Sequence, residues 1–254
     1  MTNNEYLSNI LREQTLTAAE LEALRGLRQQ IEGQLSVLEG SPRFYYGGSF
    51  GKKTMVKARY DLDLVMYWPH TATNYSISGV YTAVGNVLKK HWKYVNSKTV
   101  AWELPFDGGF HIDVVPGRAL DAQYYEANLH RTDTGTSLKT SLKTHIDIVR
   151  NSGRADAIRL VKLWRIRKNV PFKKSFLLEL MTIDGCKGKL TSDLEGQVLA
   201  TLQYIRDNVR SCSVKDPANS NNSLSDDLDA NARSSIQQAA DTAIKAQYWS
   251  QVLA

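Results

Sequence analysis

Two aspartates stand two residues apart in an apolar segment, and a third follows fifty residues later. Asp61 and Asp63 belong to DLDLVMYW, and Asp113 belongs to FHIDVV. An ionised carboxylate is costly to bury in an apolar strand unless it is paired or binds a metal. Alternate residues of a strand point to the same face, so Asp61 and Asp63 share one face. If the two strands are neighbours, three carboxylates converge, which is the ligand set that Mg²⁺ prefers.

The chemistry that such a site predicts is metal-assisted phosphoryl transfer. Two Mg²⁺ ions held by shared aspartates, with Mn²⁺ able to substitute, stabilise both the attacking and the leaving oxygen. One ion activates a 3′-hydroxyl and the other neutralises a triphosphate, and Asp113 is the natural partner of the attacking hydroxyl. His111 shares a face with Asp113, and we interpret it as a structural or surface histidine.

A Gly-Gly-Ser turn, residues 47–49, precedes the first two aspartates. Glycine permits close approach of the backbone to a ligand, so this turn can present N–H groups and a hydroxyl to phosphates. The segment is not a Walker A loop, because Tyr46 stands where that motif needs its first glycine. Lys53 also stands where the motif needs Ser or Thr.

The elements that must position these residues indicate a helix-and-sheet part, 1–136, followed by a helical part, 137–254. A capping-box pattern at Thr17 and leucines at helical spacing predict a long N-terminal helix. The segment 110–115 is expected to be a strand that Pro116-Gly117 stops. The other expected strands are 61–68, 92–96 and 99–104, and the other expected helices are 75–90, 139–151, 154–168, 175–185, 191–210 and 232–252. The turn-forming residues 216–231 are expected to be an ordered loop.

The composition, 42% hydrophobic and 23% charged over 254 residues, is typical of a globular protein. No segment approaches the roughly 20 apolar residues that span a bilayer, and no signal peptide is visible. Only two cysteines occur, which excludes a disulfide framework and favours a cytoplasmic protein without membrane insertion. Nine basic residues and one acid lie within 150–174. This imbalance fits either a polyanionic ligand or a solvated helix face.

The motifs together resemble the polymerase-β-like nucleotidyltransferase superfamily: GGS, then eleven residues, then DLDLV, and later HIDVV. The segment AIRLVKLWRIRKNVPFKKSFLLELM and the later DPANSNN resemble a particular branch. That branch contains 2′-5′ oligoadenylate synthetases, cyclic GMP-AMP synthase and bacterial CD-NTases. The resemblance covers about residues 40 to 225, which is most of the chain.

This resemblance implies an α+β, bilobed fold, in which a mixed sheet with flanking helices packs on a C-terminal helical lobe and nucleotide binds in the cleft. It also implies roles for particular residues. Asp61, Asp63 and Asp113 hold two Mg²⁺ ions and are catalytic, Gly48 and Ser49 hold the β- and γ-phosphates, Lys162 and Ser175 contact the triphosphate, and Phe176 stacks on the base.

The implied activity is that of an EC 2.7.7-type nucleotidyltransferase, which joins nucleotides from nucleoside or deoxynucleoside triphosphates and releases pyrophosphate. Its product is a cyclic or short linear oligonucleotide signal in bacterial anti-phage defence. Alternatives are a defence polymerase of the Hailong type that makes linear oligo(deoxy)adenylate, single-nucleotide transfer to protein or tRNA, and a dead-site module that binds nucleotide or RNA. An effector protein and a nucleic-acid or protein activator are further partners that the resemblance leaves open.

Overall fold

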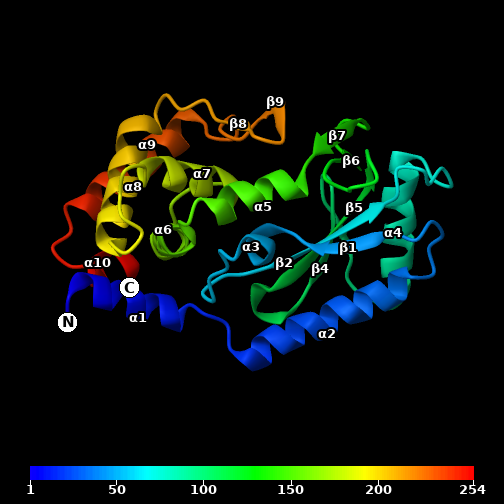
Figure 1. Cartoon of the computed structure of the whole chain (residues 1–254), viewed down its shortest axis with the longest axis horizontal. Coiled ribbons are helices and arrows are strands. Elements are labelled where there is room, and N and C mark those ends of the chain that lie inside the picture. The colour runs from blue at the N-terminus through cyan, green and yellow to red at the C-terminus, as the bar shows by residue number, and fades with distance from the viewer. The chain divides into compact units, whose positions relative to one another are not determined.

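The computed structural model describes residues 1–254, which divide into two compact units. The sheet unit comprises residues 16–52 and 60–146. The helical unit comprises residues 1–15, 53–59 and 147–254. The sequence-based boundary at residue 137 did not anticipate that the segments 1–15 and 53–59 pack with the later helices. Sheet and helices together confirm the α+β fold class (Figure 1).

The sheet unit is built on a mixed sheet in the order β1-β2-β5-β4-β3, and β6 pairs with both β5 and β7. Its central pair, β2 and β5, is parallel, and the other pairs are antiparallel. Leu62 and Leu64 of β2, with Ile112 and Val114 of β5, are fully buried. The strands are β1 Arg43–Tyr46, β2 Leu62–Trp68, β3 Asn96–Ser97, β4 Trp102–Pro105, β5 His111–Ala119, β6 Ala127–His130 and β7 Ser137–Thr140.

Two long helices, α2 and α4, belong to the sheet unit. The capping box that begins α2 is confirmed, since Thr17 Oγ1 accepts from the Glu20 N–H and the Glu20 carboxylate accepts from the Thr17 N–H. Helix α4 packs against β5 and β6, and α2 packs against α4 (Figure 1). The helices of this unit are α2 Ala18–Leu35, α3 Gly48–Lys52, α4 Ile77–His91 and the short 3-10 turn Asp107–Gly109, and α5 Leu142–Asn151 begins here.

Strand β5 corrects the prediction that Pro116-Gly117 ends the strand, because it continues through both residues. Pro116 is paired in register with Met66 of β2, and Gly117 is paired with Leu129 of β6. Proline lacks only the N–H donor, and its fixed φ is compatible with a strand. A Cβ on Gly117 would lie 2.6 Å from Leu129 Cδ2, so glycine permits the two strands to pack closely. Pairing on both sides therefore overrides the two breakers.

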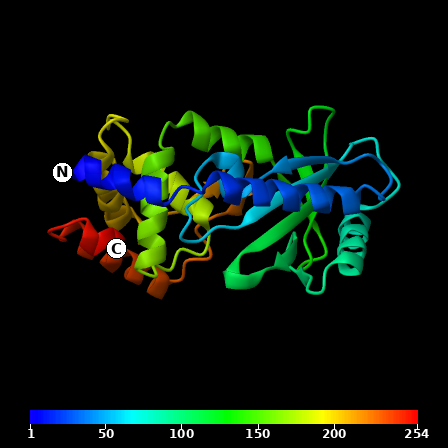
Figure 2. The ribbon, with the colours of Figure 1, turned by 90° about the horizontal axis from the view of Figure 1, so that it is seen from below.

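The helical unit has an apolar core to which most of its helices contribute. Helix α1 packs against α6 and α8 (Figure 2). The expected loop at 216–231 contains a short hairpin, and the expected helix at 232–252 divides into α9 and α10. No helix of the structure combines the length and the apolar character needed to cross a bilayer. The elements are α1 Asn3–Glu13, α6 Ala155–Arg167, α7 Ser175–Gly185, α8 Leu194–Asn208, β8 Lys215–Asp216, β9 Asn219–Ser223, α9 Ala230–Ile244 and α10 Ser250–Leu253.

Candidate active site

The parallel pairing of β2 and β5 places two of the three aspartates side by side. Asp63 and Asp113 are direct partners in the register, and Asp61 immediately precedes β2. The expectation that the two strands are neighbours is therefore confirmed. Because a one-residue slip would send every side chain to the opposite face, the buried Leu62 and Leu64 of β2 fix the aspartates on the other face of the sheet.

The glycine-serine turn packs directly on Asp63. The Gly47 N–H donates a hydrogen bond of 2.8 Å to the Asp63 carbonyl oxygen. Gly48 has φ +47°, and a Cβ at this position would overlap the Asp63 carboxylate. Both the left-handed backbone and the lack of space require glycine here. The turn continues into α3, which carries Ser49, so the predicted phosphate-binding residues lie next to a predicted metal ligand.

Burial and mutual repulsion act on these carboxylates. Loss of solvation raises the pKa of Asp63 to about 7, and the charges of Asp61 and Asp113 add to the effect. The pKa of Asp113 is also raised by desolvation, although Lys98 opposes the shift. Lys52 and Lys98 oppose the shift at Asp63. Burial is therefore the main reason why the ionised forms of Asp63 and Asp113 are unfavourable, and the nearby lysines offset only part of this cost.

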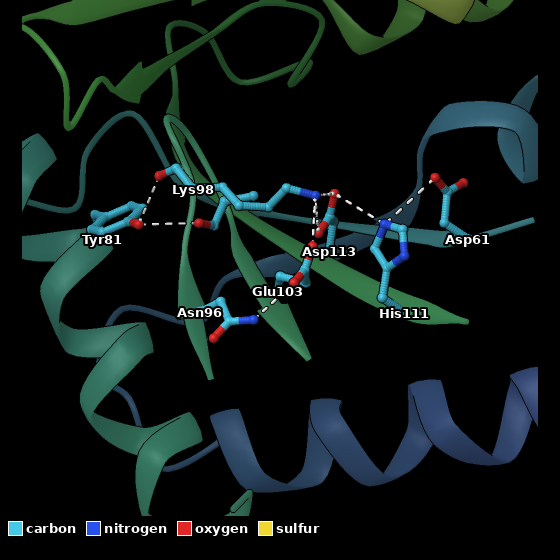
Figure 3. Close-up of polar contacts among 8 residues, drawn as sticks. Asp61, Tyr81, Asn96, Lys98, Glu103, His111 and Asp113 are labelled. Carbon is cyan, nitrogen blue, oxygen red and sulfur yellow. Dashed lines mark hydrogen bonds and ion pairs between the residues drawn. The ribbon is translucent and has the colours of Figure 1, made fainter. Parts of the chain in front are cut away.

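Lys98 reaches the third aspartate from the turn between β3 and β4. Its ammonium Nζ lies 2.8 Å from Asp113 Oδ2 and 3.1 Å from Glu103 Oε2 (Figure 3). Asn96 donates a hydrogen bond of 2.9 Å to Glu103 Oε1. Sequence reasoning missed Lys98 and Glu103. The signal that could have found Glu103 is its place opposite Asp113 in the antiparallel pair of β4 and β5, but that register was not known from the sequence.

His111 lies between two of the aspartates. Its Nε2 is 3.6 Å from Asp61 Oδ2 and 3.9 Å from Asp113 Oδ2 (Figure 3). One potential metal-ligating atom from each of Glu103, His111 and Asp113 lies within 4.8 Å of the other two. The histidine that we interpreted as structural or on the surface is thus part of the polar cluster around the aspartates.

These residues fit a divalent cation that prefers oxygen ligands. Asp61, Asp63 and Asp113 offer carboxylate oxygens, and Mg²⁺ takes oxygen ligands from one or two carboxylates together with water and phosphate. The structural observation that favours a cation is the side-by-side placement of Asp63 and Asp113 on paired strands, because a bound positive charge would stabilise neighbouring ionised carboxylates. The identity of the ion is not fixed by this geometry.

Comparison with known proteins identifies the fold. No protein-family model matches the chain. It is 26% identical over 179 residues to the cyclic AMP-AMP-AMP synthase of Escherichia coli (strain MS 115-1), a match that covers 63% of this chain and 56% of the relative. The E. coli MS115-1 CdnC structure with ATP aligns with a TM-score of 0.76 at 20% identity, covering 99% and 98% of the two chains. The Bradyrhizobium diazoefficiens CD-NTase CdnG with GTP aligns with a TM-score of 0.74 at 14% identity, covering 94% of this chain and 89% of that one.

The chain has the CD-NTase fold. The resemblance to polymerase-β-like nucleotidyltransferases and their CD-NTase branch is thereby confirmed as a likeness of fold. The match with the curated relative spans little more than half of that protein's length.

Three predicted site residues of this CD-NTase-like chain belong to the helical unit. Lys162 is buried and pairs with the carboxylate of Glu179, which is fully buried. Ser175 begins α7, and its hydroxyl accepts a hydrogen bond of 2.6 Å from Arg165 Nη1. Phe176 packs against the apolar core of the unit. Gly48, Ser49 and the three aspartates belong together to the sheet unit. The roles of all these residues in nucleotide and metal binding stay predictions.

The basic stretch 150–174 contributes much of its charge to contacts within the helical unit. Arg154 donates to Gln197 and to the Lys189 carbonyl, and Lys174 pairs with Asp227. At least six of its nine basic residues make such contacts, namely Arg154, Arg159, Lys162, Arg165, Lys168 and Lys174. The charge imbalance therefore serves internal structure at these positions, whichever ligand the unit binds.

Proposed function

We propose that this protein is a metal-dependent nucleotidyltransferase that joins nucleoside triphosphates into a cyclic oligonucleotide and releases pyrophosphate. One observation carries the proposal: Asp63 and Asp113 are paired in register, and Gly48 packs against the Asp63 carboxylate. The E. coli relative is named for a product made of three AMP units. ATP is therefore the first substrate to test.

In this proposal each residue of the sheet unit has a defined task. Asp61, Asp63 and Asp113 would hold the divalent ions, and Gly48 and Ser49 would bind the β- and γ-phosphates. When bound, the metal supplies positive charge to the triphosphate and lowers the pKa of the attacking hydroxyl. This chain's own contribution is to orient the ligands on adjacent strands and, through nearby cations, to offset part of the cost of ionising them.

Lys98 contributes to that second task. Its ammonium makes hydrogen bonds of 2.8 and 3.1 Å to the two oxygens of Asp113. It lowers the pKa of Asp113 against the opposing effect of burial. We infer that Lys98 keeps the third aspartate ionised and oriented before metal and nucleotide bind.

The alternatives are linear polymerisation, transfer of one nucleotide to protein or tRNA, and nucleotide or RNA binding without chemistry. A protein that only binds has no use for three carboxylates that repel a polyanion when metal is absent. The raised pKa of Asp63 shows that this charge is held at an electrostatic cost. This cost favours a site that needs metal over a site that only binds.

The deciding experiment supplies each labelled NTP and dNTP, singly and in mixtures, with Mg²⁺ or Mn²⁺. Mass spectrometry then identifies the products. The double variant Asp61→Ala/Asp63→Ala is the inactive control, and Asp107→Asn, which changes an exposed aspartate of the same unit, is the matched active control. A product that resists phosphatase and depends on the aspartates supports a cyclic synthase. A phosphatase-sensitive product supports a linear polymerase, and no product with any nucleotide or added nucleic acid contradicts both.

The biological setting is also part of the proposal. The product is expected to act as the signal of an anti-phage defence system, and a separate effector protein is expected to recognise it. An effector encoded next to this protein that is activated by the purified product, and not by the parent triphosphates, would support this role.

A further inference from the structure

The segment 53–59 belongs to the helical unit, and both of its ends are joined covalently to the sheet unit. It leaves α3, which carries Ser49, and returns to the sheet unit just before Asp61. Within this segment Thr54 and Val56 are buried. The segment is therefore linked through the backbone to the phosphate-binding turn on one side and to Asp61, the first proposed metal ligand, on the other.

A buried polar cluster holds the start of this segment. Thr54, which is fully buried, donates a hydrogen bond of 3.0 Å to Glu179 Oε1. Lys162 Nζ donates to Thr54 Oγ1 at 2.9 Å and to the Thr54 carbonyl oxygen at 3.3 Å, and it also pairs with Glu179. The Lys162 side chain is 7% exposed and that of Glu179 is 0% exposed. A buried ion pair of this kind survives only when further hydrogen bonds satisfy it, and Thr54 supplies them.

The rest of the segment is held by neighbouring groups of the same unit. Arg159 Nε donates to the Met55 carbonyl oxygen at 3.1 Å, and the same guanidinium bonds to the Leu11 carbonyl. The Lys57 N–H donates to the Gln14 carbonyl at 3.0 Å. The Ala58 N–H donates to Gln14 Oε1 at 2.8 Å. Together with buried Val56, every residue from 54 to 58 is thus anchored in the helical unit.

We propose that Lys162 is a positioning residue, which acts through Glu179 and Thr54 to hold the segment 53–59. By this route it sets the placement of the phosphate-binding turn and of Asp61. The proposal rests on the nucleotidyltransferase function proposed above, and it gives Lys162 a different task from the triphosphate contact that the resemblance implies.

The contacts of Lys162 favour this task over direct phosphate binding. An ammonium has three N–H donors, and Lys162 directs hydrogen bonds or ion pairs to Thr54 Oγ1, the Thr54 carbonyl and Glu179. Turning the ammonium toward a phosphate would leave the carboxylate of Glu179 buried without its cation. Loss of a paired cation from a fully buried carboxylate is strongly unfavourable in a protein interior.

The first test uses Thr54→Val, which removes the linking hydroxyl but no charge. Thr54→Ser is the conservative rescue, and Thr182→Val is the matched control. Thr182 is also a fully buried threonine of the helical unit, and its hydroxyl bonds only to a carbonyl of its own helix, that of Leu178. Amide hydrogen exchange of residues 53–59 is measured by mass spectrometry in the full chain without nucleotide. We expect exchange to rise about tenfold in Thr54→Val, in line with the loss of one buried hydrogen bond.

The second test replaces both charges, Lys162→Met with Glu179→Leu, so that no buried charge is left unpaired. If Lys162 acts by positioning, this variant and Thr54→Val share one kinetic pattern: kcat falls about tenfold or more, because small displacements of reacting groups are costly, and KM for the triphosphate changes little. Thr54→Ser and Thr182→Val are expected to behave like the wild type.

The opposite pattern overturns the proposal. If Lys162 binds the triphosphate directly, the double variant raises KM strongly, and Thr54→Val matches the wild type in both exchange and kinetics. Unchanged exchange of residues 53–59 in both variants also overturns it. A wild-type protein that makes no product contradicts the proposed function instead, and the exchange measurement still tests the anchoring independently.

Discussion

Replacing Asp63 by asparagine is expected to stabilise the metal-free protein at alkaline pH, although it removes a proposed metal ligand. Asp63 is desolvated and lies near Asp61 and Asp113, so its ionised form is unfavourable in the folded state. Asparagine has nearly the same shape and carries no charge. The expected gain in stability therefore comes first from removing the cost of burying a charge, then from removing its repulsion by Asp61 and Asp113, and not from a new contact.

The size of the effect follows from the raised pKa of Asp63, about 7 in the folded protein against an ordinary value of 3.8. Between these values the folded state binds the proton and the unfolded state does not. Stability therefore falls as pH rises from about 4 to about 7, and it stays at the lower level above pH 7. A difference of about three pKa units at about 1.4 kcal/mol each corresponds to on the order of 4 kcal/mol.

The assay is urea unfolding of the wild type and Asp63→Asn in EDTA at pH 5 and pH 8. We expect the variant to be more stable at pH 8, by up to about 4 kcal/mol, and the difference to be smaller at pH 5. Added Mg²⁺ is expected to narrow the difference at pH 8, because it stabilises only the protein that retains the ligand. Asp107→Asn, at an exposed position, should stay within about 0.5 kcal/mol of the wild type at both pH values.

One result refutes this reasoning. If Asp63→Asn is as stable as the wild type or less stable at pH 8 without metal, then the folded state does not strain the ionised carboxylate. The electrostatic argument for a cation at this site would then fail with it.

Three further predictions concern single substitutions. Gly48→Ala should lower the free energy of unfolding more than Gly109→Ala does. Both glycines have positive φ, which strains alanine by about 1–2 kcal/mol, but only a Cβ at Gly48 overlaps the Asp63 carboxylate. Urea unfolding and Mn²⁺ titration compare the two variants, and equal losses of stability would contradict the overlap. Thr17→Ala removes the hydroxyl of the capping box and should lower the free energy of unfolding by about 1 kcal/mol; no loss would show that the cap is unimportant. Lys98→Met should raise the pKa of Asp113 further, because it removes the ammonium that pairs with this carboxylate. Carbon NMR titration of the metal-free protein measures this pKa, and an unchanged or lower value would count against the ion pair.

Local signals in the sequence were sufficient for the elements that carry the site. The capping box at Thr17 and the apolar segment at 61–68 each produce the expected element, since caps and short apolar strands depend on neighbouring residues. The convergence of the three aspartates was predicted from strand periodicity on the assumption that the two strands are neighbours, whereas the register that sets Asp63 opposite Asp113 is known only from the structure. These features needed only short-range chemistry and one assumption about topology.

The features that were missed depend on tertiary pairing. Strands β6 and β7 are only four residues long, too short for a clear periodic signal, and they form by pairing, β6 with β5 and β7 with β6. Strand β5 continues through Pro116 because it pairs with β2 on one side and with β6 on the other. Glu103 joins the cluster around Asp113 because β4 lies antiparallel to β5, and sequence periodicity does not specify that register.

Two lysines, Lys98 of the sheet unit and Lys162 of the helical unit, show how burial decides a role that residue type leaves open. Lys98 is 40% exposed and pairs with Asp113, a carboxylate that a metal ion can also bind, so solvent can stabilise its ammonium if that partner is taken. Lys162 is 7% exposed, and its partner Glu179 is completely buried, so neither charge can leave the pair cheaply. A lysine of the first kind can exchange partners during a reaction, whereas one of the second kind fixes the backbone to which it is bonded. Both residues are lysine in the sequence, and only the fold shows that Lys98 is partly exposed to solvent whereas Lys162 is buried with its partner.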